Sequence, residues 1–227
     1  GHDAVDMERF QFLNEDRDFD SIHASLLRQS RLNNNYGLYE VMPGIYQVRG
    51  VDLSDLTFVR GKTGWIVFDP LVSAEPVRAA LALFQKHVGE GLPITAVIYS
   101  HTHGDHWGGV RGLGLKDEDI ASGKVPIIAP VDFMDFTVSE NVYAGNAMNR
   151  RLFYQYGLLL PASPHGYVGQ GLGQAVSAGT PGLIAPTRHV VEAIVEGGGL
   201  LRLPLGRELR HGRQPSVELG KLRIRRG

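Results

Sequence analysis

The sequence predicts an α/β protein, and three observations support this fold class. Short runs rich in β-branched and aromatic residues occur at 45–49, 56–60, 65–68 and 94–99, and they are expected to form strands. Apolar residues at helical spacing follow the third run from Ser73 to Val88. The fourth run ends in a polar loop with three histidines, and functional residues at the ends of strands are typical of α/β folds.

Local signals place the remaining elements. Glycines at 61 and 64 bracket a turn, which predicts a hairpin between the second and third strands. The helix is expected to begin near Ser73, because Pro76 is tolerated only in a first turn. Further along, a strand is expected at 125–129, with helices at 131–139 and 141–156.

The chain is expected to divide into three parts. Residues 1–40 are polar and interrupted by an Asn-rich stretch, so we expect an irregular N-terminal lead-in. Residues 41–187 are expected to form the structured domain. Residues 188–227 hold nine Lys and Arg against four Asp and Glu, with a triple glycine and poor periodicity, and we interpret them as an atypical basic tail.

Composition limits the class of protein. With 227 residues, 43% of them hydrophobic and 21% charged, the chain can bury one substantial core or two small ones. No apolar run approaches the length of a membrane helix and no signal peptide is visible, so we expect a soluble protein without a membrane span. Cytoplasmic, periplasmic and secreted locations all stay open. The basic tail lacks interleaved aromatic residues and any DNA-binding motif, so we expect no nucleic-acid partner.

The most informative motif is the segment that contains His101, His103, Asp105 and His106. Residues two apart on an extended segment point to the same side, so His101 and His103 can bind one ion while Asp105 and His106 bind a second. Zinc suits imidazole nitrogen and carboxylate oxygen, although manganese or iron would accept the same ligands. The chain has no cysteine, which excludes thiolate ligands. The alternative is a set of solvent-facing or hydrogen-bonded histidines that bind no metal.

Beyond this motif, the sequence resembles the metallo-β-lactamase superfamily, whose fold is an αββα sandwich of metal-dependent hydrolases. The resemblance rests on the hairpin, Asp69, and a strand that ends in the histidine motif followed by Trp107-Gly108-Gly109. Within the superfamily, the chain is similar to the alkyl sulfatases that hydrolyse dodecyl sulfate. The matching segments are 32–34, 44–50, 98–101, 109–112, 140–142, 144–148, 150–151, 154–157, 169–173 and 182–184.

This resemblance implies a binuclear zinc enzyme in which His101 and His103 bind one zinc ion and Asp105 and His106 the other. It covers roughly residues 28–187 and stops abruptly after Thr187, so we expect a sandwich truncated before its second half is complete. The family's other ligands, two glutamates and a histidine further along, have no recognisable counterpart in the sequence. His165, His189, Glu192 and Glu196 are the candidates to replace them, although each is more typical of an ordinary surface residue.

Other polar and aromatic residues could serve the same site. Arg150 and Arg151 could attract a sulfate, with a solvated helix face as the favoured alternative, and Asn146 is similarly open. Trp107 and Tyr154 could line an apolar pocket, although aromatic residues more often belong to the core. The glycines at 169–173 lack the spacing and the lysine of a phosphate-binding loop, so we expect a plain flexible loop.

The expected function is zinc-dependent hydrolysis of small alkyl sulfate esters by a metal-activated water. Asp105 is expected to be a ligand and also to orient the nucleophile, because a metal-bridging water needs an acceptor close by. The alternatives are another hydrolase of the superfamily, acting on thioesters, lactones or β-lactams, and a catalytically inert metal-binding fragment. A homodimer is possible.

Overall fold

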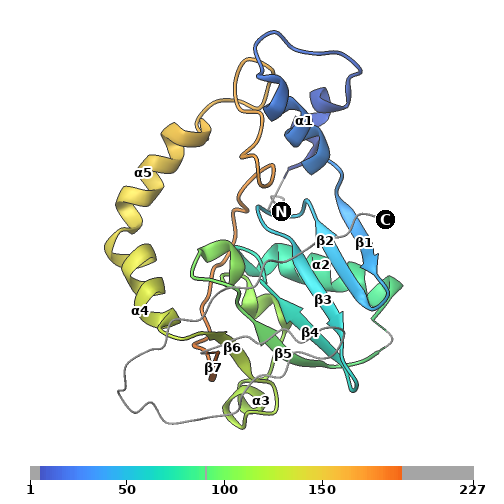
Figure 1. The fold of residues 1–227 in the computed structure, drawn as a ribbon, viewed down its shortest axis with the longest axis vertical. Coiled ribbons are helices and arrows are strands. Elements are labelled where there is room, and N and C mark those ends of the chain that lie inside the picture. The colour runs from blue at the N-terminus through green and yellow to red at the C-terminus, as the bar shows by residue number, and fades with distance from the viewer. Residues whose placement is uncertain (1–5, 90, 191–227) are drawn as a thin grey trace, which may run out of the picture. The chain divides into compact units, whose positions relative to one another are not determined.

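One mixed sheet of seven strands organises the chain in the computed structural model, which describes residues 6–89 and 91–190 (Figure 1). The strands follow each other across the sheet in sequence order. The strands are β1 (Gly37–Met42), β2 (Ile45–Arg49), β3 (Leu56–Arg60), β4 (Trp65–Phe68), β5 (Ile94–Ile98), β6 (Ile127–Pro130) and β7 (Arg188–Val190). The predicted α/β class is therefore confirmed. The described residues form one sheet and not two, which agrees with an incomplete αββα sandwich.

The sheet changes from antiparallel to parallel pairing in its middle. Strands β1 to β4 pair antiparallel with their neighbours, whereas β5 pairs parallel with β4, β6 with β5, and β7 with β6. The predicted hairpin joins β3 to β4, where the Gly61 amide donates to the Gly64 carbonyl at 2.8 Å. Parallel neighbours end at the same edge of the sheet, so β4 and β5 deliver the residues that follow them to one place.

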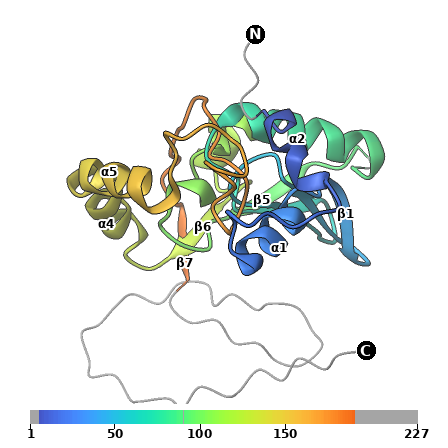
Figure 2. The same cartoon turned by 90° about the horizontal axis from the view of Figure 1, so that it is seen from above.

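Helix α2 (Ala74–His87) provides the crossover from β4 to β5 and covers one face of the sheet (Figures 1 and 2). It begins directly after Ser73, in agreement with the predicted start, and Pro76 lies in the first turn, where an amide hydrogen would have no helical partner. Val77, Ala80 and Phe84 lie one helical turn apart and are buried in the main core against the strands. The apolar spacing therefore predicted both the helix and the face that the helix buries.

Aromatic rings concentrate in this core. The ring of Phe84 stacks on that of Phe58, with centroids 3.8 Å apart, and meets Trp65 edge to face at 4.8 Å. Such pairs add about 0.5 to 1.5 kcal/mol to the burial of their apolar area. The indole Nε1 of Trp65 donates to the carbonyl of Gly89 at 3.0 Å, so its polar atom is also satisfied in the interior.

The N-terminal forty residues differ from the expectation of an irregular lead-in. They contain the 3-10 helix η1 (Glu8–Asn14) and the helix α1 (Ala24–Asn33), and β1 begins at Gly37. Phe10, Leu13 and Leu27 are buried in a second core, together with Tyr167 and Val168. The sequence did not show this packing, because the two segments lie about 140 residues apart. The glycine-rich stretch at 169–173, predicted to be a plain flexible loop, forms no helix or strand, and the adjoining Gln174 donates to the carbonyl of Ser30 on α1 at 3.2 Å.

Three short helical elements connect β5 to β6. These are the 3-10 turns η2 (Gly104–His106) and η3 (Val110–Leu113) and the helix α3 (Asp117–Ala121). Strand β6 begins two residues later than predicted, because the amide of Val125 donates to the carbonyl of Asp119 at 2.9 Å and does not join the sheet.

The predicted helices at 131–139 and 141–156 form a continuous arm. It consists of α4 (Phe133–Val138), the π-helical turn η4 (Ser139–Tyr143) and α5 (Gly145–Tyr156). Helix α5 buries none of its residues, and Figures 1 and 2 both show it leading away from the sheet. Among the helices of residues 6–89 and 91–190, none is both long and apolar enough to cross a membrane. Of the predicted basic tail, residues 188–190 form β7, and the rest lies outside the described residues.

Candidate metal centre

The structure brings the four predicted ligands together in the loop that follows β5. The rings of His101 and His103 are 4.6 Å apart between centroids, and those of His101 and His106 are 4.0 Å apart. Oδ2 of Asp105 lies 3.2 Å from Nε2 of His106. The turn η2 folds the loop back, since the amide of His106 donates to the carbonyl of His103 at 3.0 Å. A six-residue segment therefore presents three imidazoles and a carboxylate on one surface.

Asp69 joins this group from the end of β4. Its Oδ1 accepts a hydrogen bond from the amide of Ser100 at 2.7 Å, and its Oδ2 lies 3.0 Å from Nδ1 of His106. The residue adopts φ = +52°, a left-handed conformation that aspartate tolerates better than most residues. Sequence analysis used Asp69 only as part of the family resemblance, and its contact with the site depends on the parallel pairing of β4 with β5.

The charges around His106 are closely coupled. Burial by itself would lower the pKa of His106, but Asp105 and Asp69 outweigh it and raise this pKa to about 9. For Asp105, burial acts to raise the pKa, and His106 more than compensates, so the pKa is lowered. Burial and the neighbouring His106 and His103 lower the pKa of His101. A positive charge is therefore favoured between the two carboxylates, where a proton and a metal cation would compete.

The donor atoms are paired with one another. Across residues 6–89 and 91–190, no group of three or more His, Asp or Glu side chains is arranged to hold a metal ion. Nδ1 of His106 is buried, and the atom 3.0 Å from it is Oδ2 of Asp69. A buried imidazole beside two carboxylates and two further imidazoles matches the ligand chemistry of zinc.

Glycines hold the loop of residues 101–109, called the metal loop below, close to the start of α2. A Cβ at Gly108 would lie 2.2 Å from the carbonyl oxygen of Val72, and one at Gly109 would lie 2.4 Å from that of Pro70. The Gly108 carbonyl also accepts from the amide of Gly182 at 2.7 Å. On the other side of the loop, the hydroxyl of Ser54 donates to the carbonyl of Asp105. Only glycine permits this approach of backbone to backbone.

Asp52 accepts hydrogen bonds from three segments of the chain, at Leu53, at Val72 and at Ser177. Its side chain is buried and accepts four hydrogen bonds: from the amides of Leu53 at 2.9 Å, Val72 at 3.0 Å and Ser177 at 2.8 Å, and from the Ser177 hydroxyl at 2.8 Å. Burial raises the pKa of Asp52 although these donors oppose it. Sequence reasoning missed this residue, because the partners are scattered along the chain.

The other candidates lie apart from these contacts or outside the described part of the chain. His165 is exposed in a turn, and Nδ1 of His189 on β7 lies 3.4 Å from the carbonyl of Pro130. Glu192 and Glu196 lie outside the described residues. Tyr154 is 90% exposed and therefore lines no pocket in this structure.

The remaining candidates are found on the arm and beside the loop. Arg150, Arg151 and Asn146 are exposed on α5, in agreement with a solvated helix face. Trp107 is half-buried against the main core, and its Nε1 donates to the carbonyl of Thr102 at 2.9 Å.

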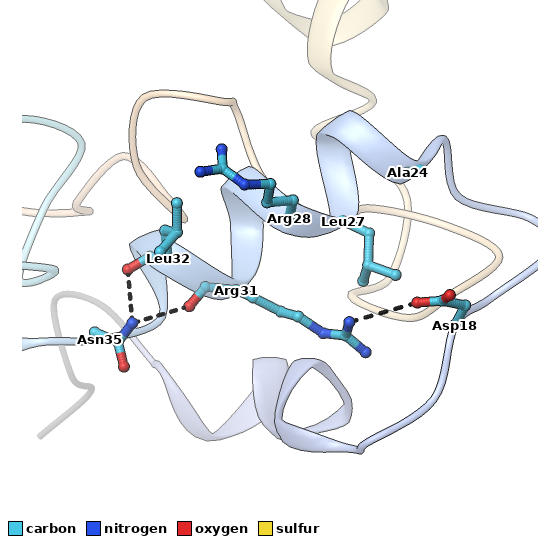
Figure 3. Close-up of a pocket in the computed structure, with 7 residues that line it drawn as sticks. All are labelled: Asp18, Ala24, Leu27, Arg28, Arg31, Leu32 and Asn35. Atoms are coloured by element: carbon cyan, nitrogen blue, oxygen red, sulfur yellow. Dashed lines mark hydrogen bonds and ion pairs between the residues drawn. The ribbon is translucent and has the colours of Figure 1, made fainter.

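Two surface hollows lie near α1, and no residue of the metal loop lines either. The first, about 320 Å³, is lined by Leu27, Arg28, Arg31 and their neighbours (Figure 3). Arg31 pairs with Asp18 at 3.6 Å and donates to the carbonyls of Leu13 and Glu15, so its charge stabilises the N-terminal segment. The second, about 480 Å³, is lined by residues of α1, β1 and the loop before β3.

The sequence profile described as the metallo-beta-lactamase superfamily matches residues 49–206. The chain is 52% identical over 173 residues to a linear primary-alkylsulfatase of Pseudomonas sp., an alignment that covers 76% of this chain and 25% of the relative. It is 44% identical over 190 residues to an alkyl/aryl-sulfatase of Saccharomyces cerevisiae, covering 84% of this chain and 29% of the relative.

A solved structure has the same fold over most of this chain. The stereoselective inverting sec-alkylsulfatase Pisa1 from Pseudomonas sp. superposes with a TM-score of 0.78 at 42% identity, covering 85% of this chain and 31% of that one. The chain thus spans between a quarter and a third of the length of these relatives. The histidine loop, the partial sandwich and the profile match agree, and the chain belongs to the metallo-beta-lactamase superfamily.

Proposed function

We propose that this chain contributes metal ligands to a zinc-dependent hydrolase that acts on alkyl sulfate esters. The observation that carries the proposal is the loop after β5, where three imidazoles and two carboxylates lie within a few ångströms of each other. The 52% identity to a linear primary-alkylsulfatase supports the choice of substrate class.

In this proposal, His101, His103, Asp105 and His106 are the zinc ligands. When bound, zinc supplies an activated water at neutral pH and neutralises charge on the sulfate. Asp105, which accompanies His106 in the structure, would also orient the attacking water through its second oxygen. Asp69 holds His106 from the other side and is itself fixed by the amide of Ser100. The protein's contribution is to keep these groups in place on a loop whose backbone packs closely against the start of α2.

A second candidate is a segment that binds metal but has no turnover of its own. It is favoured by the arrangement of the donors, because across residues 6–89 and 91–190 no group of three or more His, Asp or Glu side chains is arranged to hold a metal ion. A β-lactamase, lactonase or thioesterase activity is a third possibility within the superfamily.

Hydrolysis assays separate these candidates. Purified chain with added zinc is incubated with dodecyl sulfate, nitrocefin and a panel of lactones and thioesters, with the His101→Ala/His103→Ala double variant as the control. Sulfate release that the double variant lacks supports the proposal. Hydrolysis of a lactone or of nitrocefin alone contradicts it, and zinc binding without any hydrolysis supports the second candidate.

A further inference from the structure

Glu140 contacts the metal loop through both of its carboxylate oxygens. Oε2 accepts a hydrogen bond from the hydroxyl of Thr102 at 3.0 Å, and Oε1 lies 3.1 Å from Nε2 of His103. The side chain of Glu140 is 26% exposed, compared with 58% for that of His103. The carboxylate is therefore the more enclosed partner, and the ring of His103 also meets that of His101 edge to face, with centroids 4.6 Å apart.

The π-helical turn η4 explains why Glu140 reaches this position. The amide of Ala144 donates to the carbonyl of Ser139 at 3.0 Å, five residues earlier, which is the hydrogen bond of a π-helix. The extra residue in the turn shifts the face that the following side chains present. Glu140 and Asn141 lie within this turn and both contact the metal loop, and π-helical turns are frequent at functional sites.

The same turn fixes the backbone beside His103. Nδ2 of Asn141 donates to the carbonyl of Thr102 at 3.3 Å and to that of Thr137 at 2.9 Å. Nε1 of Trp107 donates to the Thr102 carbonyl at 2.9 Å. Thr102 is thus held at its hydroxyl and at its carbonyl, so the position of the next residue, His103, is defined relative to Glu140.

A carboxylate next to one nitrogen of a neutral imidazole determines which nitrogen carries the proton. An acceptor at Nε2 favours the tautomer with hydrogen on Nε2, which leaves a lone pair on Nδ1. A metal ion needs an unprotonated nitrogen, and ligating histidines generally donate their other N–H to a carboxylate or a carbonyl. We propose that Glu140 is a positioning residue that orients His103 and reserves its Nδ1 for the metal ion. This inference deepens the metal site of the proposed function and rests on it.

The tautomer can be observed directly in the metal-free chain. Long-range ¹H–¹⁵N NMR spectra at alkaline pH distinguish a protonated imidazole nitrogen from one with a lone pair, and a His103→Gln variant assigns the signal. We expect hydrogen on Nε2 of His103 in the wild-type chain and a mixture of tautomers in Glu140→Leu. Thr102→Val, which removes only the contact at Oε2, should keep the wild-type tautomer. Hydrogen on Nδ1 in the wild-type chain, or identical spectra for wild type and Glu140→Leu, would overturn the inference.

Zinc affinity provides a second readout, measured by competition with a chromophoric chelator. Glu140→Leu should weaken zinc binding about 10- to 100-fold, the usual effect of removing a carboxylate partner from a ligating histidine. Glu140→Gln, which keeps an acceptor oxygen, should lose less. Glu118→Leu, an exposed glutamate on α3, is the matched control and should bind zinc like the wild type. Equal affinity of wild type and Glu140→Leu contradicts the inference.

Circular dichroism verifies that each variant is folded. Both readouts are obtained without an alkyl sulfate, so their failure is distinct from an absence of sulfate release. A chain that shows the expected tautomer but hydrolyses no sulfate ester would contradict the proposed function and leave the role of Glu140 intact.

Discussion

Replacement of Gly109 by alanine tests whether close backbone packing holds the metal loop. A Cβ at this position would lie 2.4 Å from the carbonyl oxygen of Pro70, 2.5 Å from that of Ser73 and 2.5 Å from Cγ2 of Val77. Two of the three neighbours are backbone atoms, which cannot rotate away. Gly109 has φ = −88°, so alanine adds no backbone strain and the effect is purely one of space.

The size of the effect follows from these distances. Ordinary contacts of a Cβ are 3.4–4 Å, so the new methyl group overlaps its neighbours by about 1 Å. Overpacking of this kind costs about 3 kcal/mol, at the upper end of its usual range, because three contacts are violated at once. For a domain of this size, that corresponds to a decrease in Tm of roughly 6 to 12 °C. The loop must also shift, and a displacement of about 1 Å is enough to disturb a metal or catalytic site.

Thermal unfolding followed by circular dichroism measures the decrease, and chelator competition measures zinc affinity. Gly145→Ala is the matched control, because a Cβ there meets nothing within 4 Å and its φ is not positive. We expect Gly109→Ala to lose both stability and zinc affinity and Gly145→Ala to keep both. A Gly109→Ala chain whose Tm is within about 2 °C of the control would refute the reasoning.

Three further changes test the packing around the site. Phe84→Ala removes the ring that meets three other aromatic rings and should lower the free energy of unfolding by about 4 kcal/mol, measured by urea denaturation. Tyr99→Phe deletes the buried hydrogen bond to the carbonyl of Ile184 and should cost about 1 to 2 kcal/mol in the same assay; no loss would contradict the assigned bond. The amide and hydroxyl of Thr180 lower the pKa of Glu75 to about 2, from an ordinary 4.5. Its carboxylate therefore stabilises the fold above the ordinary pKa, and this contribution disappears as the pH falls towards about 2. The stability difference between wild type and Glu75→Gln should accordingly shrink on acidification, and a constant difference would count against the linkage.

Local patterns in the sequence were sufficient for the elements that carry the metal loop. The glycine-bracketed turn, the Ser73 cap with Pro76, and the apolar run before His101 are each encoded within a few residues, and each predicted element is present. The four predicted ligands are likewise neighbours in the sequence. Their convergence needed no knowledge of the tertiary fold, because an extended strand end followed by a tight turn brings them to one surface.

These local patterns could not predict contacts between segments that are far apart in the sequence. The N-terminal helices are held by Tyr167 and Val168, and apolar residues there give no sign of a partner so far along the chain. Asp69 and Glu140 reach the metal loop from β4 and from the π-helical turn, through sheet pairing and through one inserted residue in a helix. A single acidic residue in a sequence has no feature that distinguishes such a role from an ordinary surface charge.

The zinc content of the purified chain after exhaustive dialysis tests the central claim most directly. Mass spectrometry would compare the wild-type chain with the His101→Ala/His103→Ala double variant. If the loop after β5 is a metal centre, the wild-type chain retains zinc and the double variant loses it while keeping its circular dichroism spectrum. Equal zinc content in the two chains, or none in either, would contradict the assignment of residues 101–106 as the metal centre.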